Sequence, residues 1–270
     1  MVDFAELPAP PGTRFSPVRL VAETGSTNAD LLERAGAGER AGSVLVTDHQ
    51  RAGRGRQQRV WHDEPGNSLL VSVLLRPEPS QAPLLPLVTG LAAVDAVART
   101  LEQAADGPGS VPPAGRQAGL KWPNDVLVPA LGERKLAGIL AEATSSGPSS
   151  SLAVVVGMGL NLRWMTPPPA EIERRLVTLT EVVGGPVDRD QVLGHFLVAL
   201  ESWLQALDGG RPVLDAYREA CLTLGRQVRF TSVGTVHEGQ AVAVSDTGSL
   251  ILESADGDRV ELNAGDAHHV

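Results

Sequence analysis

The stretch "NSLLVSVLL" (Asn67–Leu75) decides the fold class of this 270-residue chain. It is nearly all apolar, which is typical of a strand buried on both faces, because a strand with one wet face alternates polar and apolar residues. Such a strand needs partners on both edges and a layer over each face. The stretch therefore predicts a strand in the interior of a sheet, covered on both faces.

The segments around this strand supply the other elements. Apolar residues recur with helical spacing from Pro83 to Ala105, which predicts a long amphipathic helix. Further strands are predicted in "VRLVAET", "SVLVT", "GLKWPNDVLV", "RKLAGILAEAT" and "LAVVVGMGLNL". The last two would form a hairpin whose tip, "SSGPSSS", is expected to be mobile.

Two other regions are expected to be helical. In "STNADLLERAGAG", Ser26 or Thr27 is a plausible N-cap, Asp30 approximates a capping box, and the glycines end the helix. After "TPPPA", two apolar stripes have helical spacing: Ile172, Leu176, Leu179 and Val183, and then Val192, Leu193, Phe196, Leu197, Leu200, Trp203, Leu204 and Leu207.

The chain changes character after Leu224. Short alternating runs separated by glycine and Asp-Gly turns predict a small β-barrel. Its acidic character, with Arg259 as the one basic residue from position 231 onward, argues against nucleic-acid binding. His268 and His269 are expected to lie in a disordered tail. The predicted organisation is an arm (1–17), a catalytic domain (18–222) and a C-terminal β domain (223–270).

Composition narrows the class of protein. The net charge is -9, the hydrophobic content 42 % and the charged content 20 %, which is typical of a globular protein that does not bind nucleic acids generally. No signal peptide and no run long enough for a membrane span are evident. Cys221, the single cysteine, is expected to be a buried apolar group in a reducing cytoplasm. The histidine spacing gives no metal cage.

The segment "HQRAGRGRQQRVW" (49–61) concentrates positive charge in this acidic chain. Arg51, Arg54, Arg56 and Arg59 lie within nine residues, and glycines are interspersed among them. Arginine offers forked donors for phosphate and carboxylate oxygens, and glycine lets backbone N–H groups approach a ligand closely. The segment therefore predicts an anion-binding loop. A solvated basic loop, or one that binds RNA, is the alternative.

Three later segments carry further candidate residues. "KWPNDVLV" presents Lys121, Asn124 and Asp125 beside Trp122, and a simple turn is the alternative. In "RKLAGILAEAT", strict alternation puts Lys135 on one face with Ala137 and Ile139, and from spacing alone an edge gatekeeper against aggregation is favoured. Gly138 in the same strand suggests close approach of a ligand or another backbone. "GMGLN" by itself is a weak signal.

Taken together and in this order, "GSTN", "DHQRAGRGRQQRVW", "KWPNDVLV", "RKLAGILAE" and "GMGLNL" resemble the biotin–protein ligases. The resemblance implies an α+β fold of the class II synthetase-like, biotin–lipoate ligase type. Its catalytic domain would be a mixed sheet backed by helices, followed by a small C-terminal SH3-like β-barrel. It implies that ATP activates biotin to biotinyl-5′-AMP, with Mg²⁺, and that biotin is then transferred to a lysine of a biotin carboxyl carrier domain. It also implies a monomer or weak homodimer, and no DNA binding, since only about 20 residues precede the first catalytic strand.

The family's functional residues map onto this sequence by motif. A usual loop glycine is replaced by Gln58, which would cost on the order of 1 kcal/mol if that position needs a positive φ. The loop is expected to be mobile when empty and to close over the adenylate. The implied catalytic residues are Lys135, Arg56 and Asp125; the biotin contacts are Ser26, Thr27, Asn28, Gln50, Arg54, Gly55, Arg56, Lys135 and Gly138; the nucleotide contacts are Arg54, Arg56, Arg59, Trp61, Lys121, Asn124 and Asn161.

Two rival functions stay open at this point. A lipoate or octanoate ligase or transferase shares the implied fold class, and the arginine loop together with "KWPND" is the reason to rank biotin first. A non-catalytic nucleotide sensor or RNA-binding protein would instead use the arginine loop to bind RNA in a salt-sensitive manner.

Overall fold

An eight-stranded sheet forms the centre of the computed structural model, which describes residues 4–105, 115–145, 152–232, 235–263 and 265–269. The strand order is β1-β2-β3-β4-β8-β7-β6-β5. β2 and β3 run parallel and the other neighbours antiparallel, so the predicted mixed sheet is confirmed. The strands are β1 (Ala5–Leu7), β2 (Val18–Thr24), β3 (Val44–Gln50), β4 (Ser68–Leu75), β5 (Gly119–Lys121), β6 (Asp125–Val128), β7 (Arg134–Thr144) and β8 (Ala153–Asn161).

β4, the strand expected from the apolar stretch, is buried at all of its 8 residues. It pairs with β3 on one edge and with β8 on the other. Side chains alternate along a strand, so Leu69, Val71 and Val73 contribute to one apolar cluster while Leu74 contributes to the other. β7 and β8 form the predicted hairpin, and its tip lies outside the described residues.

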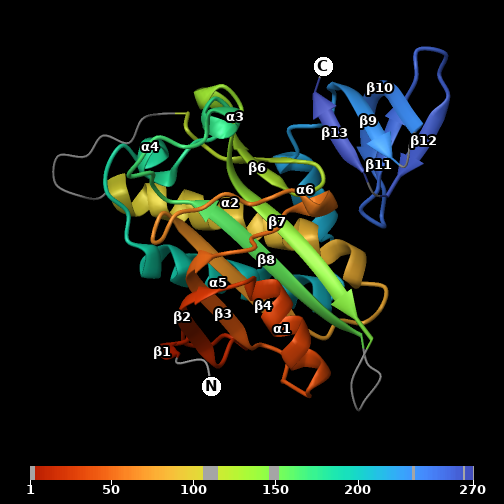
Figure 1. Ribbon diagram of the computed structural model, residues 1–270. Coiled ribbons are helices and arrows are strands. Elements are labelled where there is room, and N and C mark those ends of the chain that lie inside the picture. Colours follow the sequence, from red (N-terminus) through yellow and green to blue (C-terminus); the bar gives the residue numbers. More distant parts are fainter. Residues whose placement is uncertain (1–3, 106–114, 146–151, 233–234, 264, 270) are drawn as a thin grey trace.

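One face of the sheet is covered by two long helices, α2 (Leu85–Ala105) and α5 (Arg189–Asp208), which lie behind the strands in Figure 1. The helix predicted up to Ala105 is thus confirmed, and a 3-10 turn, η2 (Ala82–Leu84), precedes it. Contrary to the sequence reading, residues 82–105 are long and apolar enough for a membrane span. In this fold their buried side chains pack against α5 and the sheet.

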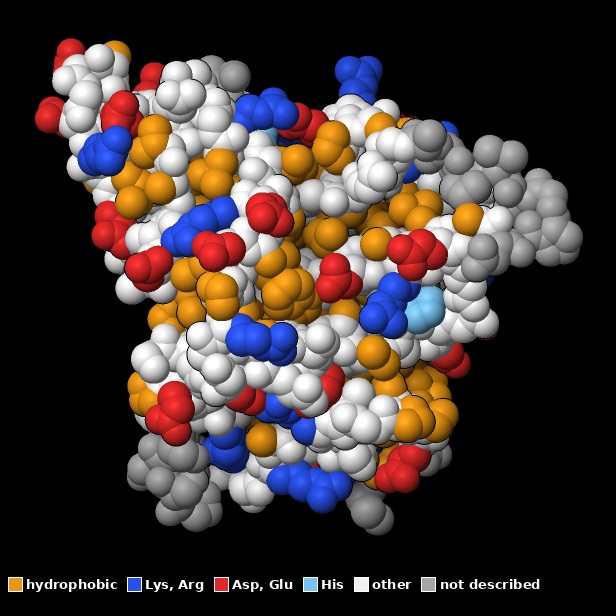
Figure 2. Space-filling view, turned by 180° about the vertical axis from the view of Figure 1, so that it is seen from behind, with side chains coloured by type: hydrophobic (Ala, Val, Ile, Leu, Met, Phe, Trp, Pro, Cys, Tyr) orange, Lys and Arg blue, Asp and Glu red, His pale blue; other side chains and the backbone are white. Residues whose placement is uncertain are grey.

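The outer surface on the helix side carries charges of both signs. Lys and Arg side chains are interspersed with Asp and Glu side chains across the face seen from behind (Figure 2). A surface of mixed sign does not attract a polyanion over a broad area. This face therefore gives no support to the RNA-binding alternative.

The opposite face is covered at one end by α1 (Thr27–Gly36). Leu31 and Ala35 of α1 pack with Leu74 and Val155 of the sheet in a second, smaller apolar cluster. Ser26 is the N-cap, as predicted. The expected capping box is not formed, because the Asp30 carboxylate accepts a hydrogen bond from Thr24 Oγ1 at 2.6 Å instead. Beyond α1 this face is open, and the cavity described below lies there.

The helical region after "TPPPA" is broken where one continuous stripe was expected. Ile172 lies in a short helix, α3 (Ala170–Glu173), whereas Leu176 forms a bridge with Lys135 of the sheet. A new helix, α4 (Leu179–Val183), then begins at a capping box between Thr178 and Glu181. The cap of α4 and the pairing of Leu176 with Lys135 interrupt the helix. The spacing of apolar residues did not reveal this break, because it continues unchanged across it. α6 (Val213–Ala220) follows α5.

The described part of the N-terminal segment, expected as an extended arm, packs against the main domain. β1 pairs with β2 at the edge of the sheet, and Phe15 is fully buried. Glu201 of α5 accepts a hydrogen bond from the backbone N–H of Arg14 at 2.9 Å and pairs with its guanidinium at 3.0 Å. This segment therefore contributes to the core.

The C-terminal region forms an open five-stranded antiparallel sheet in the order β12-β11-β10-β9-β13. The strands and turns are as expected, but the described residues of β12 and β13 are not paired with each other, so the predicted small barrel is not closed. His268 and His269, expected in a disordered tail, form part of β13 and pair with Arg229 and Val228 of β9. The strands are β9 (Gln227–Ser232), β10 (Thr235–Val244), β11 (Leu250–Glu253), β12 (Arg259–Leu262) and β13 (Asp266–His269).

Trp122 fastens this second sheet to the first domain. Its side chain is 1 % exposed. Its indole N–H donates to the carbonyl of Gly248 at 2.9 Å, and its ring centroid lies 6.0 Å from that of Phe230. Its backbone N–H donates to Thr223 Oγ1 at 3.0 Å. The tryptophan of the "KWPND" turn therefore holds the two sheets together, which a simple turn would not require.

Candidate active site

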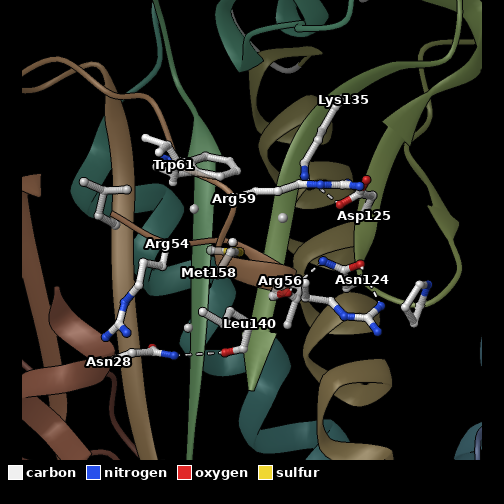
Figure 3. Close-up of a pocket in the computed structure, with 18 of the residues that line it drawn as sticks. Asn28, Arg54, Arg56, Arg59, Trp61, Asn124, Asp125, Lys135, Leu140 and Met158 are labelled. Atoms are coloured by element: carbon white, nitrogen blue, oxygen red, sulfur yellow. Dashed lines mark hydrogen bonds and ion pairs between the residues drawn. The ribbon is translucent and has the colours of Figure 1, made fainter. Parts of the chain in front are cut away.

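A cavity of about 180 Å³ lies on the open face of the large sheet. Its walls come from the start of α1, the arginine loop, the turn after β5, and strands β7 and β8 (Figure 3). The C-terminal sheet contributes Ala267 and His268. Residues separated by more than 200 positions in the sequence therefore meet around one space.

Glycines form the floor of this cavity. Gly138 of β7 and Gly159 of β8 are cross-strand neighbours, and Gly157 is two residues away. A Cβ on Gly159 would lie 2.6 Å from the Trp61 ring, and one on Gly157 would lie 2.3 Å from Asn28 Oδ1. No real Cβ atom tolerates such distances, so a side chain at either position would displace the group above it. At Gly138 a Cβ would meet Lys135 Nζ at 3.0 Å, so the close neighbours there are side chains rather than the ligand or backbone expected.

The arginine loop folds back over this floor as a narrow hairpin. Arg54 and Val60 form a bridge, the backbone N–H of Gly55 donates to the carbonyl of Arg59 at 2.7 Å, and a 3-10 turn, η1 (Arg56–Gln58), makes the tip. Gln58 has φ +60°, so the left-handed conformation considered for this position is confirmed. Gln57 is left-handed as well, at φ +54°.

The arginines of the loop point to different ends of the cavity. Arg54 points toward Asn28, Arg56 toward Asn124, and Arg59 toward the pair formed by Lys135 and Asp125 (Figure 3). Arg56 Nη1 donates to Asn124 Oδ1 at 3.4 Å. Cations are thus distributed along the whole length of the space.

Lys135 projects into the cavity because β7 is irregular at this point. Leu127 of β6 pairs with Lys135, whereas the preceding Val126 pairs with Ala137. The pairing therefore skips one residue of β7, and a bulge lies between Lys135 and Ala137. The expected alternation with Ala137 and Ile139 is therefore wrong, and the lysine lies over Gly138 instead. The edge-gatekeeper reading is also wrong, because β7 lies inside the sheet between β6 and β8.

The Lys135 ammonium has two neighbours in this position. Its Nζ lies 2.7 Å from Asp125 Oδ1 and 5.5 Å from the centre of the Trp61 ring. Both side chains of the ion pair remain partly exposed, at 35 % and 24 %. A partly exposed ammonium can exchange one anionic partner for another at small cost. It can therefore meet an incoming phosphate or carboxylate.

The turn between β5 and β6 fixes Asn124 at the cavity wall. Asn124 Nδ2 donates to the carbonyl of Ile139 at 3.0 Å, and the Ile139 N–H donates to the carbonyl of Asn124 at 2.8 Å. Two bonds in opposite directions lock this residue to β7. Lys121, at the end of β5, also lines the cavity.

A chain of hydrogen bonds organises the end of the cavity near α1. Thr27 donates its backbone N–H and its hydroxyl to Gln50 Oε1, at 2.9 and 3.1 Å. Ser72 Oγ lies 2.7 Å from Thr27 Oγ1 and 2.6 Å from Asn28 Oδ1. Asn28 Nδ2 donates to Glu142 Oε2 at 2.8 Å. Polar side chains linked in this way are held in one orientation. This end can therefore recognise a polar ring through hydrogen bonds.

The cavity therefore joins two chemical environments. The end near α1 offers hydrogen-bonded polar side chains together with the guanidinium of Arg54, and the other end offers the cations Lys121, Lys135, Arg56 and Arg59. Fixed cations lower the repulsion between two anions that must react with each other. The arrangement is suited to joining a carboxylate to a phosphate.

Known proteins are similar to this chain in sequence and in fold. Residues 23–161 match the biotin/lipoate A/B protein ligase family, and residues 223–270 match the biotin protein ligase C-terminal domain. The chain belongs to the biotin/lipoate A/B protein ligase family. It is 38 % identical to the biotin–acetyl-CoA-carboxylase ligase of Mycobacterium tuberculosis, over 96 % of this chain and 91 % of that protein.

Two further relatives of this ligase-family chain support the same assignment. The bifunctional ligase/repressor BirA of Bacillus subtilis is 32 % identical, over 86 % of this chain and 68 % of that protein. The biotin protein ligase from Aquifex aeolicus, solved in complex with biotin and ATP, is 27 % identical with a TM-score of 0.76, and 95 % of this chain and 100 % of that chain are covered. The resemblance noted in the sequence is thus confirmed.

Most of the residues carried over by motif come together in this member of the ligase family. Asn161 is the exception, because it is 3 % exposed, does not line the cavity, and donates to the carbonyls of Lys135 at 3.2 Å and Val177 at 3.4 Å. It holds the backbone of Lys135 from behind. The carried-over residues that line the cavity are Ser26, Thr27, Asn28, Gln50, Arg54, Gly55, Arg56, Arg59, Trp61, Lys121, Asn124, Asp125, Lys135 and Gly138.

Several contributors to the site of this ligase-family chain were not predicted from the sequence. Ser72 was hidden in an apolar strand, although its hydroxyl is the polar interruption of "LLVSVLL". Glu142 is the last residue of "RKLAGILAE", and its carboxylate accepts a hydrogen bond from Asn28. Ala267 and His268 belong to the other domain, so their position depends on how the two sheets dock.

Cys221 is buried as predicted, and burial raises the pKa of its thiol despite hydrogen bonds from neighbouring groups. Among the described ranges, no group of three or more His, Cys, Asp or Glu side chains could hold a metal ion.

Proposed function

We propose that this chain activates biotin with ATP and transfers it to a lysine of a biotin carboxyl carrier domain. A biotin carboxylate oxygen attacks the α-phosphorus of ATP, which forms biotinyl-5′-AMP and releases pyrophosphate. The ε-amine of the acceptor lysine then attacks the acyl carbon and releases AMP. The convergence of Lys135 and the loop arginines over a glycine floor carries the proposal, because the first step brings two anions together.

The residues divide between the two ends of the cavity. Ser26, Thr27, Asn28 and Gln50 contact the ureido ring, with Arg54, Gly55 and Gly138 beside the rest of biotin. Lys135 and Arg56 neutralise the reacting carboxylate and α-phosphate, and Asp125 receives the proton of the acceptor lysine. Arg54, Arg59, Trp61, Lys121 and Asn124 contact the nucleotide, and Mg²⁺ enters bound to the phosphates of ATP.

The acceptor domain approaches through a second cavity of about 630 Å³ between the two sheets. This cavity shares Arg56, Trp122, Asn124 and Leu140 with the first one, so a lysine side chain entering it reaches the acyl group. We propose that the catalytic domain (18–222) and the C-terminal domain (223–270) both contact the carrier. We place the reaction in the cytoplasm, where the thiol of Cys221 stays reduced.

Lipoate is the competing substrate within this family. The hydrogen-bonded end of the cavity favours biotin, because a cyclic urea has two N–H donors and a carbonyl acceptor, whereas a dithiolane ring has neither. The wild-type chain should support ATP–pyrophosphate exchange with biotin and not with lipoate or octanoate. Exchange that depends on lipoate, or no exchange with either acid, would overturn the proposal.

A further inference from the structure

A buried carboxylate outside the cavity has no part in the chemistry described so far. The side chain of Asp63 is only 1 % exposed. Removing a carboxylate from water costs several kcal/mol unless partners compensate. Asp63 Oδ2 has two partners, the backbone N–H of Gln50 at 3.2 Å and His49 Nδ1 at 2.9 Å.

These partners place Asp63 at the base of the arginine loop. The chain enters the loop at Gln50, the last residue of β3, and leaves it at Trp61, two residues before Asp63. One carboxylate therefore ties the incoming strand to the outgoing strand. Inside the loop the two strands are joined by the Arg54–Val60 bridge and by the Trp61 N–H, which donates to the carbonyl of Gly53 at 3.0 Å.

The same carboxylate also acts, through Gln50, on the end of the cavity near α1. Because Asp63 holds the backbone of Gln50, the side chain of Gln50 stays directed toward Thr27, which donates two hydrogen bonds to its Oε1. The position of the loop base is thus linked, bond by bond, to the first turn of α1. An anchor on one side alone would leave the loop free to swing away from Thr27.

We propose that Asp63, supported by His49, is a positioning residue that clamps the base of the arginine loop and keeps the loop closed over the acyl-adenylate. The inference rests on the proposed function, since it concerns retention of that intermediate. A closed cover keeps water from the mixed anhydride until the acceptor lysine arrives. Loss of the clamp should therefore increase escape and hydrolysis of the intermediate more than it slows its formation.

The experiment measures how the intermediate partitions in the full-length chain. Biotinyl-AMP is formed from radiolabelled biotin on the enzyme, a biotin carboxyl carrier domain is added, and label transferred to the carrier is compared with label released. Asp63→Ala should raise the released-to-transferred ratio by about tenfold, the change expected for loss of a hydrogen bond to a charged group. Asp63→Asn keeps an acceptor for the Gln50 N–H, and should stay within about threefold of wild type.

A matched control removes a different carboxylate at the same place. Glu23 pairs with Arg51 of the loop at 3.2 Å, but both side chains are largely exposed, at 48 % and 68 %. Exposed pairs contribute little, so Glu23→Ala should leave the ratio unchanged. If Asp63→Ala does not fold, His49→Ala serves as the second variant and should raise the ratio by about threefold.

The outcomes separate this inference from the proposed function. If the wild-type chain forms no biotinyl-AMP, the proposed function fails first. If it forms the intermediate and the folded Asp63→Ala or His49→Ala variant partitions it like wild type, the clamp is refuted. A loss of thermal stability with an unchanged ratio would show that Asp63 only supports the fold.

Discussion

The two faces of the large sheet use the same strands for different purposes. Toward α2 and α5, β8 directs Val154 and Val156 into one continuous apolar core. Toward the other side, the same strand directs Val155 to α1 and then presents Gly157 and Gly159 to the cavity. Because successive side chains point to opposite faces, one strand supports stability on one side and chemistry on the other. The difference predicts that the two properties respond to different substitutions.

Loss of the ammonium at the cavity face should have the largest effect. In Lys135→Ala, the rate of biotinyl-AMP formation should fall about 10²- to 10³-fold, because a preorganised donor to a developing charge is removed. Single-turnover kinetics would measure this rate. Arg229→Ala, which changes an exposed pair in the C-terminal sheet, is the control. A fall of less than about threefold would contradict this assignment of Lys135.

A truncation on the helix face should act on stability alone. Val156→Ala removes two buried methyl groups from the core, and should lower the free energy of unfolding by about 2 kcal/mol. Denaturant unfolding would measure that loss, and kcat/KM of the folded enzyme should stay unchanged. Val236→Ala, at a valine that is 57 % exposed, should leave stability unaltered. A large loss of kcat/KM in Val156→Ala would show that the two faces are not separable.

The reverse substitution, an added methyl group on the cavity face, should act on binding. In Gly157→Ala the new Cβ would meet Asn28 Oδ1 at 2.3 Å, so Asn28 must move. Biotin affinity should fall by about tenfold, equivalent to about 1.4 kcal/mol. Calorimetric titration with biotin would measure it, and Gly194→Ala in α5, where a Cβ meets nothing within 4 Å, is the control. Unchanged affinity would show that Asn28 does not contact the ligand.

The helix face contains one buried carboxylate, and it should make stability depend on pH. Burial alone would raise the pKa of Glu201, but the hydrogen bonds from Arg14 and Gln205 outweigh it and lower the pKa below its usual value. Its contribution of about 1 kcal/mol is therefore complete above about pH 4.3 and is lost as the pH falls through the lowered pKa. Unfolding of wild type and Glu201→Gln from pH 7 to 3 would test this. The two stability curves should converge at acidic pH, and parallel curves would contradict it.

The smallest effect is expected at the tip of the loop that covers the cavity. Gln58 occupies a left-handed conformation, and Gln58→Gly should relieve less than about 1 kcal/mol of strain. The rate of adenylate formation should therefore change by less than about fivefold, as single-turnover kinetics can show. A much larger gain would mean that glutamine damages the loop rather than only loosening it.

The comparison also explains which predictions from the sequence succeeded. β4 and α2 were found because their apolar patterns reflect burial that the strand or helix period alone imposes. Lys135 was misplaced by spacing because a bulge shifts the alternation by one residue. The region from Ile172 to Val183 was misread because a capping box at Thr178 starts a new helix within an apparently continuous stripe.

The sequence by itself determined the mixed sheet, its helical cover, the arginine loop and most residues of the cavity, because each is encoded in local patterns or in motifs read in order. Only the tertiary structure decided that Gly138, Gly157 and Gly159 form one floor, that Asn161 lies behind Lys135, and that His268 reaches the cavity from the second sheet. The open edge of that second sheet was likewise beyond sequence reasoning. The physical reason is that strand register and domain docking depend on contacts between distant segments, which no local spacing contains.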